Sequence, residues 1–367
     1  MLNADCVTVP VRHILSSVQF GPRRGIAIAL SGGGDSTALL CLLHDFYSER
    51  GEEDRLFAVT VDHGLRPDSA AEARRAADFC EALSIPHTIR RWEGEKPAGG
   101  LQAAAREARY GLLADAADAA GCGLVMTGHT LDDQAETVAM RRARGNGRGL
   151  SGIAPATLHD KRIWFVRPLI GQRRAELRAF LAERGQGWID DPSNIDPRFE
   201  RVRMREAIGQ GKCDTKAFRA AFAARRLQSE QAAALLANDN AWSFDRDART
   251  AQLTVDVVAG LEAFPLALAV VMGWAGHVAH LPTGPVLEKA VAFCSPAPSG
   301  RKMTAAGCLL SKAQGRVAIG REARNTRNEG FGFDHLLPSP DYAVAEALAL
   351  RVGGAPFPPP PLSGYPD

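Results

Sequence analysis

The chain has 367 residues, of which 46% are hydrophobic and 23% are charged, and its formal net charge at pH 7 is only +2. This composition is typical of a folded globular protein with two or three domains, and it excludes a disordered or fibrous chain. The nearly balanced charge also excludes binding of nucleic acid through overall charge, so any basic contact surface has to be local.

The seven cysteines are scattered, without a Cys-x-x-Cys pair or regular spacing. This usage is typical of a reducing compartment and argues against a structural zinc site or an iron–sulfur cluster. Residues 1–10 lack a basic segment followed by an apolar core, so we expect no signal peptide. No apolar run reaches about 18 residues. The sequence therefore predicts a cytoplasmic protein without a membrane-spanning segment.

Apolar segments alternate with amphipathic segments through residue 145, which predicts an α/β fold with a doubly wound, mostly parallel sheet. The expected strands are Ile26–Leu30, Leu56–Val61, His87–Arg91 and Gly123–Thr127. The expected helices are Thr37–Tyr47, Ser69–Leu83, Leu101–Ala120 and Asp132–Arg144. In such a sheet, ligands bind beyond the carboxyl ends of the strands.

The first expected strand leads into a glycine-rich segment, Ser31-Gly32-Gly33-Gly34-Asp35-Ser36. Glycine lets several backbone N–H groups converge on a phosphate, and the helix that follows adds its positive dipole end. We therefore expect an oxyanion site here, with an ordinary glycine turn as the alternative. The patterns of P-loop nucleotidases and of dinucleotide-binding folds are both absent. The segment instead resembles the PP-loop of ATP pyrophosphatases, which cleave ATP between its α and β phosphates.

Two more polar motifs follow strand ends, at residues 62–66 (DHGLR) and 128–133 (GHTLDD). Because three motifs share this placement, we expect them to border one crevice. The helix after the last motif puts Glu136 one turn from Asp132 and Asp133. These carboxyls cap the helix or, beside a phosphate, hold Mg²⁺ together with Asp35, accept a proton or bind an ammonium group.

Arginines gather in three places. Arg106 and Arg109 share one helix face with Gln102 and Tyr110, where they neutralise a triphosphate or pair with nearby carboxylates. The other two groups indicate either a nucleic-acid surface or a solvated face. Their members that we expect to contact RNA are Arg141, Arg144, Arg148, Arg201 and Arg205.

The motifs, taken in order, closely resemble those of the tRNA(Ile)-lysidine synthase family over residues 25–206. The matching blocks are residues 31–36, 61–66, 102 with 105–110, 127–137, 144–153, 167–169 and 188–194 with 201–205. Thr130 stands where the family usually has a second histidine, and Val202 where it usually has asparagine. Sulfur-transferring relatives that thiolate tRNA usually carry paired Cys-x-x-Cys motifs, which this chain lacks.

The resemblance implies a two-step reaction on the wobble cytidine of tRNA(Ile) with a CAU anticodon. ATP adenylates the C2 oxygen and releases pyrophosphate, and the ε-amine of free L-lysine then displaces AMP. The product, lysidine, changes codon reading from AUG to AUA. The resemblance also implies that ATP contacts residues 31–36, Arg106, Arg109 and His129, and that Asp133 and Glu136 bind lysine.

The lysine ε-amine has a reference pKa of about 10.4, so a base must remove a proton before it attacks. We expect Asp132 to be that base or a metal ligand, with Asp35 second, and the two to hold Mg²⁺. Two other functions stay open: a PP-loop synthetase acting on small molecules, and a nucleotide-binding module without catalysis. The sequence also leaves the oligomeric state open, a homodimer included.

Beyond residue 210 the sequence predicts a helix over Thr215–Ala237, a buried helix over Leu261–Val278 and a hairpin within Cys308–Arg321. The prolines after Asn325 predict a partly extended or disordered tail. We therefore expect a PP-loop ATP-binding catalytic domain at 1–206 and a proline-rich tail at 326–367. Between them, the resemblance implies a helical or mixed tRNA-recognition domain at 207–325.

Overall fold

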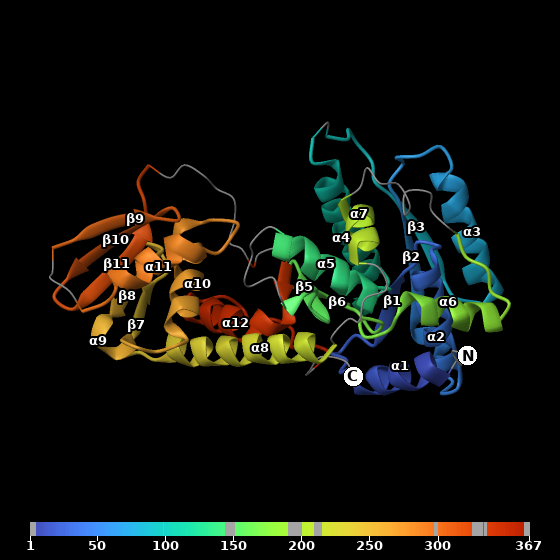
Figure 1. Cartoon of the computed structure of the whole chain (residues 1–367), viewed down its shortest axis with the longest axis horizontal. Helices are drawn as coiled ribbons and strands as arrows, with labels where there is room; N and C mark the ends of the chain where they lie inside the picture. The colour runs from blue at the N-terminus through green and yellow to red at the C-terminus, as the bar shows by residue number, and fades with distance from the viewer. Residues whose placement is uncertain are drawn as a thin grey trace. The chain divides into compact units, whose positions relative to one another are not determined.

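The computed structural model describes residues 5–97, 99–143, 151–189, 200–208, 215–296, 300–324, 333 and 336–362. The chain forms two compact units, each with its own sheet (Figure 1). Unit 1 comprises Met1–His159, Ile163–Ala221 and Pro359–Asp367, and unit 2 comprises Asp160–Arg162 and Phe222–Pro358. The domain boundaries expected near residues 206 and 325 stay predictions.

Six strands of unit 1 lie in the order β5-β6-β4-β1-β2-β3. They are β1 (Gly25–Ala29), β2 (Leu56–Asp62), β3 (His87–Arg91), β4 (Cys122–Met126), β5 (Ala156–His159) and β6 (Ile163–Val166). Neighbouring strands are parallel except for β5, which runs antiparallel to β6. The predicted fold class is therefore confirmed, and the four predicted strands are present within one residue at each end.

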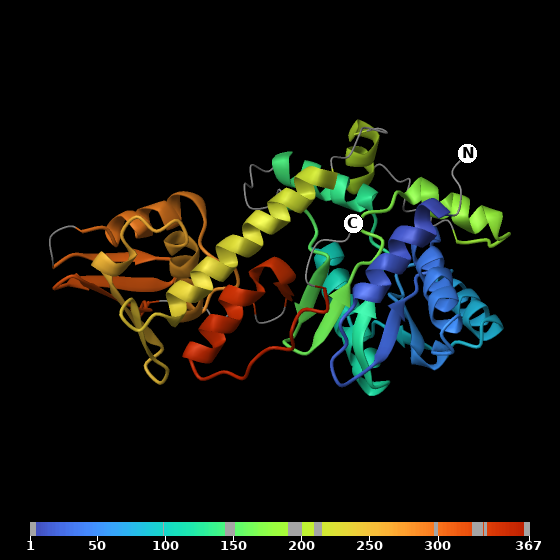
Figure 2. The same cartoon turned by 90° about the horizontal axis from the view of Figure 1, so that it is seen from below.

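Helices connect these strands and continue beyond them. They are α1 (Asp5–Ser17), α2 (Gly34–Ser48), α3 (Ser69–Ala82), α4 (Leu101–Ala119), α5 (Leu131–Ala143), α6 (Arg174–Glu183) and α7 (Glu200–Ile208), with a 3₁₀ turn, η1 (Glu53–Arg55). The core of unit 1 lies where the buried side of α4 packs on the central strands, with Leu113 beside Val125 and Phe165. Figure 2 shows α1 alongside α2, with which it is in contact.

The strand order reverses between β1 and β4, because β2 and β3 lie on one side of β1 and β4 and β6 on the other. Sheets of this kind bind ligands in the crevice at such a reversal. The start of α2, which follows β1, and the loop that follows β4 come close there through their backbones. A Cβ on Gly128 would lie 2.8 Å from the carbonyl oxygen of Asp35, so only glycine allows this approach.

Unit 2 contains an antiparallel sheet in the order β7-β8-β11-β10-β9. Its strands are β7 (Trp242–Asp245), β8 (Thr250–Thr254), β9 (Lys302–Ala305), β10 (Cys308–Ala313) and β11 (Arg316–Arg321). The predicted hairpin is β10–β11. The helices along this part of the chain are α8 (Thr215–Ala237), α9 (Val255–Val258), α10 (Phe264–Gly276), α11 (Gly284–Phe293) and α12 (Tyr342–Arg351).

The predicted bounds of α8 agree with the structure, and the predicted buried helix is the shorter α10, almost all of whose residues are buried. The expected extended tail is wrong for residues 336–351, which form β12 (Leu336–Pro338), η4 (Ser339–Asp341) and α12. In α12, Val344, Ala345 and Leu348 are buried on one side, and this apolar face packs against α10. Pro338 and Pro340 precede the helix and the other prolines of the tail follow it, so none interrupts it.

Of the described residues, no helix combines the length and apolar character that a membrane crossing requires.

Candidate active site

The glycine-rich segment forms a tight turn between β1 and α2. Gly32 has φ +79°, a conformation that L residues rarely adopt, and a Cβ there would lie 2.7 Å from Ile189 Cδ1. The hydroxyls of Ser31 and Ser36 are 3.0 Å apart, and Ser36 Oγ donates to the Gly33 carbonyl at 3.0 Å. Gly33 provides no side-chain cap for α2. Backbone N–H groups of the first turn are therefore available for an anion.

A cavity of about 900 Å³ borders this turn. All three predicted motifs contribute to its lining, through Ser31, Asp62, His63, Gly128, His129 and Asp133. The expected common crevice is therefore present in unit 1.

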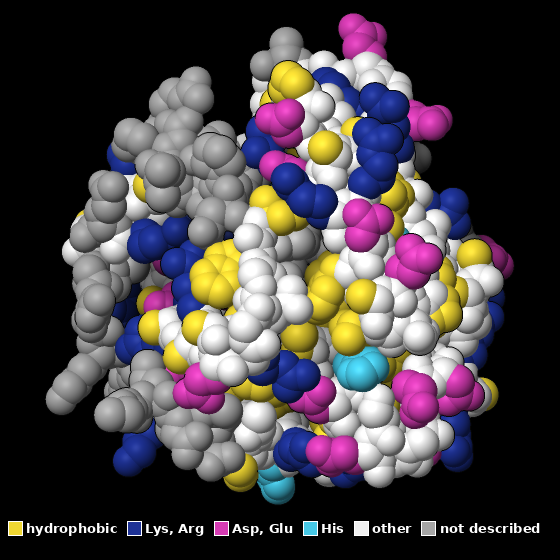
Figure 3. Space-filling model, turned by 90° about the vertical axis from the view of Figure 1, so that its right-hand side faces the viewer, with side chains coloured by type: hydrophobic (Ala, Val, Ile, Leu, Met, Phe, Trp, Pro, Cys, Tyr) yellow, Lys and Arg dark blue, Asp and Glu magenta, His cyan; other side chains and the backbone are white. Residues whose placement is uncertain are grey.

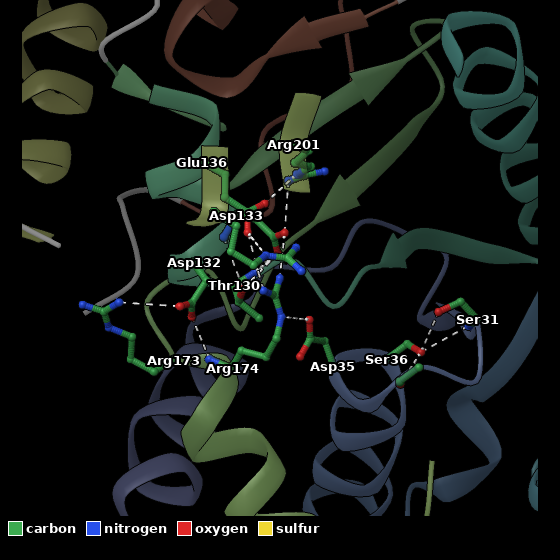
Figure 4. Close-up of polar contacts among 12 residues, drawn as sticks. Ser31, Asp35, Ser36, Thr130, Asp132, Asp133, Glu136, Arg173, Arg174 and Arg201 are labelled. Carbon is green, nitrogen blue, oxygen red and sulfur yellow. Dashed lines mark hydrogen bonds and ion pairs between the residues drawn. The ribbon is translucent and has the colours of Figure 1, made fainter. Parts of the chain in front are cut away.

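Arg174, at the start of α6, connects the PP-loop with the acidic motif (Figure 4). Its Nε lies 2.9 Å from Asp35 Oδ2, its Nη2 lies 3.1 Å from Asp133 Oδ1, and its Nη1 lies 3.6 Å from Glu136 Oε1. Burial alone would lower the pKa of Arg174, but Asp133 and Asp35 raise it above its usual value. The guanidinium therefore stays charged among these carboxylates.

The two carboxylate oxygens of Asp35 have different surroundings, since only Oδ2 contacts Arg174. Burial raises the pKa of its carboxyl, although the charge of Arg174 opposes this shift. Its Oδ1 is buried and has no hydrogen-bond partner among the described residues. A buried carboxylate oxygen of this kind is a suitable ligand for a cation.

Asp133 and Glu136, called the acidic pair below, are buried side chains of α5. Thr130 precedes the helix and donates to Asp133 Oδ2 from its backbone N at 2.7 Å and from its Oγ1 at 2.9 Å. Asp133 N in turn lies 3.4 Å from Thr130 Oγ1. Thr130, one of the two departures from the family pattern, is thus a capping residue that fixes Asp133.

Two arginines of α7 also contact the acidic pair. Arg201 Nη2 lies 3.0 Å from Asp133 Oδ1, and its Nε lies 2.7 Å from Glu136 Oε2. Arg205 Nε lies 2.7 Å from Glu136 Oε1. Residues predicted to bind RNA therefore lie against residues predicted to bind lysine.

Asp132 occupies a different position from Asp35. Its Oδ2 accepts a hydrogen bond from the backbone N of Arg174 at 2.8 Å, and its Oδ1 lies 3.6 Å from Arg173 Nη1 (Figure 4). Asp132 therefore caps α6, whereas the Arg174 side chain reaches Asp35. The structure places Arg174 between the two carboxylates, and their roles as base and Mg²⁺ ligands stay predictions.

A group of arginines surrounds Tyr110 and His129. The members of this arginine group are Arg106, Arg109 and Arg167. Tyr110 Oη accepts hydrogen bonds from Arg106 Nη2 at 3.1 Å and from Arg167 Nη2 at 3.0 Å. Burial alone would raise the pKa of Tyr110, but the arginine group lowers it to about 8. Arg167 is itself only 1% exposed.

His129 lies in the positive field of the same group, with its Nδ1 2.9 Å from Thr127 Oγ1. Burial and the nearby arginines hold the pKa of His129 well below its usual value, so the imidazole is neutral. Arg109 and His129 line the cavity, whereas Arg106 is exposed. The arginine group therefore contributes positive charge to the cavity wall through Arg109, which favours binding of a polyanion.

The remaining predicted RNA contacts are only partly described. Arg141 Nη1 donates to the Gly152 carbonyl at 2.8 Å. Arg144, Arg148 and the segment 190–194 lie outside the described residues. The face drawn in Figure 3 carries basic and acidic side chains intermingled, as expected from the small net charge.

Sequence reasoning missed Arg174 and assigned no role to Tyr110 or Arg167. One signal was present for Arg174. Arg173 and Arg174 stand at the N-terminus of α6. This end of a helix carries a partial positive charge, which disfavours cations. Such a pair indicates carboxylates nearby.

Comparison with known proteins identifies the family. Residues 8–211 match the family described as a PP-loop domain. The tRNA(Ile)-lysidine synthase of Mesorhizobium japonicum is 54% identical over 202 residues, which cover 53% of this chain and 44% of that protein. The tRNA(Ile)-lysidine synthase of Rhizobium meliloti is 42% identical over 332 residues, which cover 83% of this chain and 69% of that protein.

Among solved structures, the U34-tRNA thiolase NcsA of Methanococcus maripaludis is 19% identical with a TM-score of 0.48, covering 61% of this chain and 80% of that one. The chain spans about half the length of several curated relatives that it matches: the matched region covers 44%, 54% and 46% of the proteins from Mesorhizobium japonicum, Rhodopseudomonas palustris and Brucella ovis. Because the PP-loop match takes in more than half of the chain and the Rhizobium similarity most of it, the chain belongs to the tRNA(Ile)-lysidine synthase family.

Proposed function

We propose that this chain is an ATP-dependent ligase that joins L-lysine to C2 of the wobble cytidine in tRNA(Ile) with a CAU anticodon, releasing AMP and pyrophosphate. The observation that carries the proposal is one cavity bordered by uncapped helix amides and by Arg109, His129 and the acidic pair residue Asp133. These features match a polyanionic leaving group and an amine nucleophile that arrives as an ammonium cation and loses a proton before it attacks. The curated relatives bear the name of this activity.

In the first step, the C2 oxygen of cytidine attacks the α-phosphorus of ATP and pyrophosphate leaves. Backbone N–H groups of residues 32–36 and the hydroxyls of Ser31 and Ser36 share the charge of the departing phosphates. Arg109 of the arginine group lines the same cavity and supplies further positive charge. A neutral His129 contributes a hydrogen bond without adding repulsion among the arginines.

Asp35 fits a role in binding Mg²⁺, because its Oδ1 is buried and has no partner within the described structure. Mg²⁺ in nucleotide sites is commonly held by one or two carboxylates together with phosphate oxygens. When bound, the ion would neutralise charge on the triphosphate. Among the described residues, no group of three or more His, Cys, Asp or Glu side chains is arranged to hold a metal ion.

In the second step, the ε-amine of lysine attacks C2 and AMP leaves. The acidic pair binds the incoming ammonium, and a carboxylate takes the proton that the amine must lose. Asp132 and Asp35 are the two candidate acceptors. Of the two, only Asp35 lines the cavity, whereas Asp132 caps α6.

The RNA must present an unstacked cytidine, and the protein must hold the phosphates beside it. Arg201 and Arg205 line the cavity and are partly exposed, so they can reach a phosphate. Arg141, Arg144 and Arg148 would extend this basic surface. Free lysine, ATP and tRNA are all solutes of the cytoplasm, which is therefore the proposed location.

The proposal is tested by incubating the pure chain with ATP, Mg²⁺, labelled L-lysine and RNA transcripts. The CAU-anticodon tRNA(Ile) is the substrate, and a methionine tRNA with the same anticodon is the matched control. We expect label only in the isoleucine tRNA, with one AMP per lysine, and none with the Asp35→Asn variant. ATP–pyrophosphate exchange without tRNA would instead indicate a small-molecule synthetase, and no turnover a nucleotide-binding module.

A further inference from the structure

The arginine group lies around Tyr110 without a carboxylate partner. Arg167 Nη1 donates to the carbonyl of Ala154 at 2.8 Å, and its Nη2 donates to Tyr110 Oη at 3.0 Å. Arg106 Nη2 donates to the same phenol oxygen at 3.1 Å. Among the described residues, no Asp or Glu forms an ion pair with Arg106, Arg109 or Arg167. Their positive charge therefore has no acidic counterpart in the described part of the chain.

Burial makes the missing counterpart important. Arg167 is only 1% exposed, and a buried cation without an anion beside it is strongly unfavourable. It cannot become neutral, because the guanidinium keeps its proton in proteins. Burial lowers the pKa of Arg109, the charge of Tyr110 opposes this shift, and nearby arginines add to it. Of the described side chains in contact with the group, Tyr110 is the one that can supply negative charge.

The hydrogen bonds of Tyr110 favour the charged form as well. Its Oη accepts from two guanidiniums, which occupies both acceptor positions of a phenol. A neutral phenol also has a proton to donate, and Tyr110 Oη donates to none of the described residues. A phenolate needs no such acceptor. An oxygen that faces only charged donors is stabilised in its ionised form.

The groups around Tyr110 come from several elements, and their charges have one sign. They are Arg106 and Arg109 of α4, Arg167 after β6, His159 of β5 and, farther out, His129 after β4 and Arg201 of α7. The ring of His159 stacks on that of Tyr110, with centroids 6.0 Å apart. Burial alone would raise the pKa of Tyr110, but the arginine group outweighs burial and lowers it to about 8.

We propose that Tyr110 is the counter-ion of the arginine group in the nucleotide-free chain, and that its phenolate takes up a proton when the triphosphate of ATP binds these arginines. This inference rests on the proposed function. The proton comes from the solvent, the O–H bond of the phenol forms, and no other bond changes. Tyr110 is not among the residues that line the cavity, so it is a positioning residue that acts through the arginines.

The phenolate has a purpose before ATP arrives, because it holds together guanidiniums that repel one another. Arg106 is exposed, so its side chain can turn from Tyr110 to a phosphate. Water can then fill the position that Arg106 leaves and accept the phenolic proton. The negative charge of the triphosphate replaces that of the phenolate. ATP and the proton therefore strengthen each other's binding.

The first measurement is an ultraviolet absorption titration, which detects tyrosinate directly. In the unmodified chain without ATP, we expect one tyrosine to ionise with a midpoint near pH 8, and Tyr110→Phe should lack this step. Saturating ATP at pH 9 should remove most of the tyrosinate signal. Tyr47→Phe is the matched control, because Tyr47 is also buried in unit 1 and burial raises its pKa to about 12. It should keep the step.

The second measurement is calorimetry of ATP binding with Mg²⁺, without tRNA or lysine, in two buffers that differ in ionisation enthalpy. If ATP returns the pKa of Tyr110 to its usual 10.0, the unmodified chain should take up about 0.5 proton more than Tyr110→Phe at pH 8 and about 0.8 more at pH 9. Because binding favours the protonated form, the Kd for ATP should also rise about tenfold between pH 7 and 9 relative to that of the variant.

The proposal is overturned if no tyrosine of the unmodified chain ionises between pH 7 and 9, or if ATP leaves the tyrosinate signal unchanged. It is also overturned if a folded Tyr110→Phe takes up as many protons with ATP as the unmodified chain does. Thermal unfolding reports whether the variants are folded. Lysidine formation without the proton uptake refutes this inference alone, whereas absence of both ATP binding and lysidine refutes the proposed function together with it.

Discussion

The backbone approach between Gly128 and the start of α2 provides a sharp test of the site. In Gly128→Ala, the new Cβ would lie 2.8 Å from the Asp35 carbonyl oxygen, 2.9 Å from its carbon and 3.0 Å from Ser36 N. Ordinary contact begins at 3.4 Å, so the two loops must separate by 0.4 to 0.6 Å. The neighbours are backbone atoms of a helix start, which cannot rotate away as a side chain can. Overpacking of this kind typically destabilises a protein by about 1–3 kcal/mol.

We expect the free energy of unfolding of Gly128→Ala to fall within that range, measured by chemical denaturation. We also expect a weaker affinity for ATP, measured by calorimetry, because the separation displaces the amides of the PP-loop from His129. Gly111→Ala is the matched control. Gly111 lies within α4 and a Cβ there would meet nothing within 4 Å, so this change should stabilise the helix by about 0.5–1 kcal/mol. Unchanged stability and unchanged ATP affinity in Gly128→Ala would refute the close approach.

Three further changes test other parts of the structure. Tyr110 has a pKa of about 8 in the folded chain, below its usual 10.0, so its ionisation stabilises the fold by up to about 2.7 kcal/mol. This stabilisation is complete above pH 10 and is lost as the pH falls through 8, and Tyr110→Phe should lack it. If the free energies of unfolding of the variant and the unmodified chain changed in parallel between pH 7 and 10, the prediction would be wrong. Asp132→Asn should keep the cap on α6 through its amide oxygen, so the free energy of unfolding should change by less than about 1 kcal/mol. If Asp132 is the base, the rate of lysidine formation should fall about 10²–10⁴-fold. Near-normal turnover would show that Asp132 only caps α6. Asp341 pairs with Arg225 through both of its carboxylate oxygens, and its side chain is 3% exposed. Asp341→Asn should therefore lower the free energy of unfolding by up to about 3 kcal/mol, measured by chemical denaturation followed by intrinsic tryptophan fluorescence. An unshifted midpoint would disprove this contribution.

The parts of the fold that could be predicted depend on local patterns. Each of these patterns is contained within a few consecutive residues: the short strands, the glycine-rich turn and the polar residues at strand ends. The structure places all of them as expected. The start of α2 was predicted three residues late, because glycine is a poor helix former. In the structure Gly34 is the first residue of the helix, and a Cβ there would be in ordinary contact with Trp188 at 3.6 Å.

The parts that could not be predicted depend on contacts between distant segments. Arg174 meets Asp35 from 139 residues away, and no periodicity records that pairing. The proline content of the tail concealed α12, whose stability comes from packing on α10 rather than from its own sequence. Asp132 illustrates the same limit: its contact with the backbone of Arg174, 42 residues away, caps α6 and could not be predicted, whereas its catalytic role stays a prediction.

The distribution of charge differs between the arginine group and the acidic pair. Burial and the arginines hold the pKa of His129 well below its usual value, and the same arginines lower the pKa of Tyr110 to about 8. Positive charge of this kind favours a polyanion such as a triphosphate. The acidic pair, in contrast, already accepts hydrogen bonds from guanidinium groups of α6 and α7. A cation that binds the pair must share these carboxylates with the guanidiniums or displace one of them, because an unpaired buried carboxylate is strongly unfavourable.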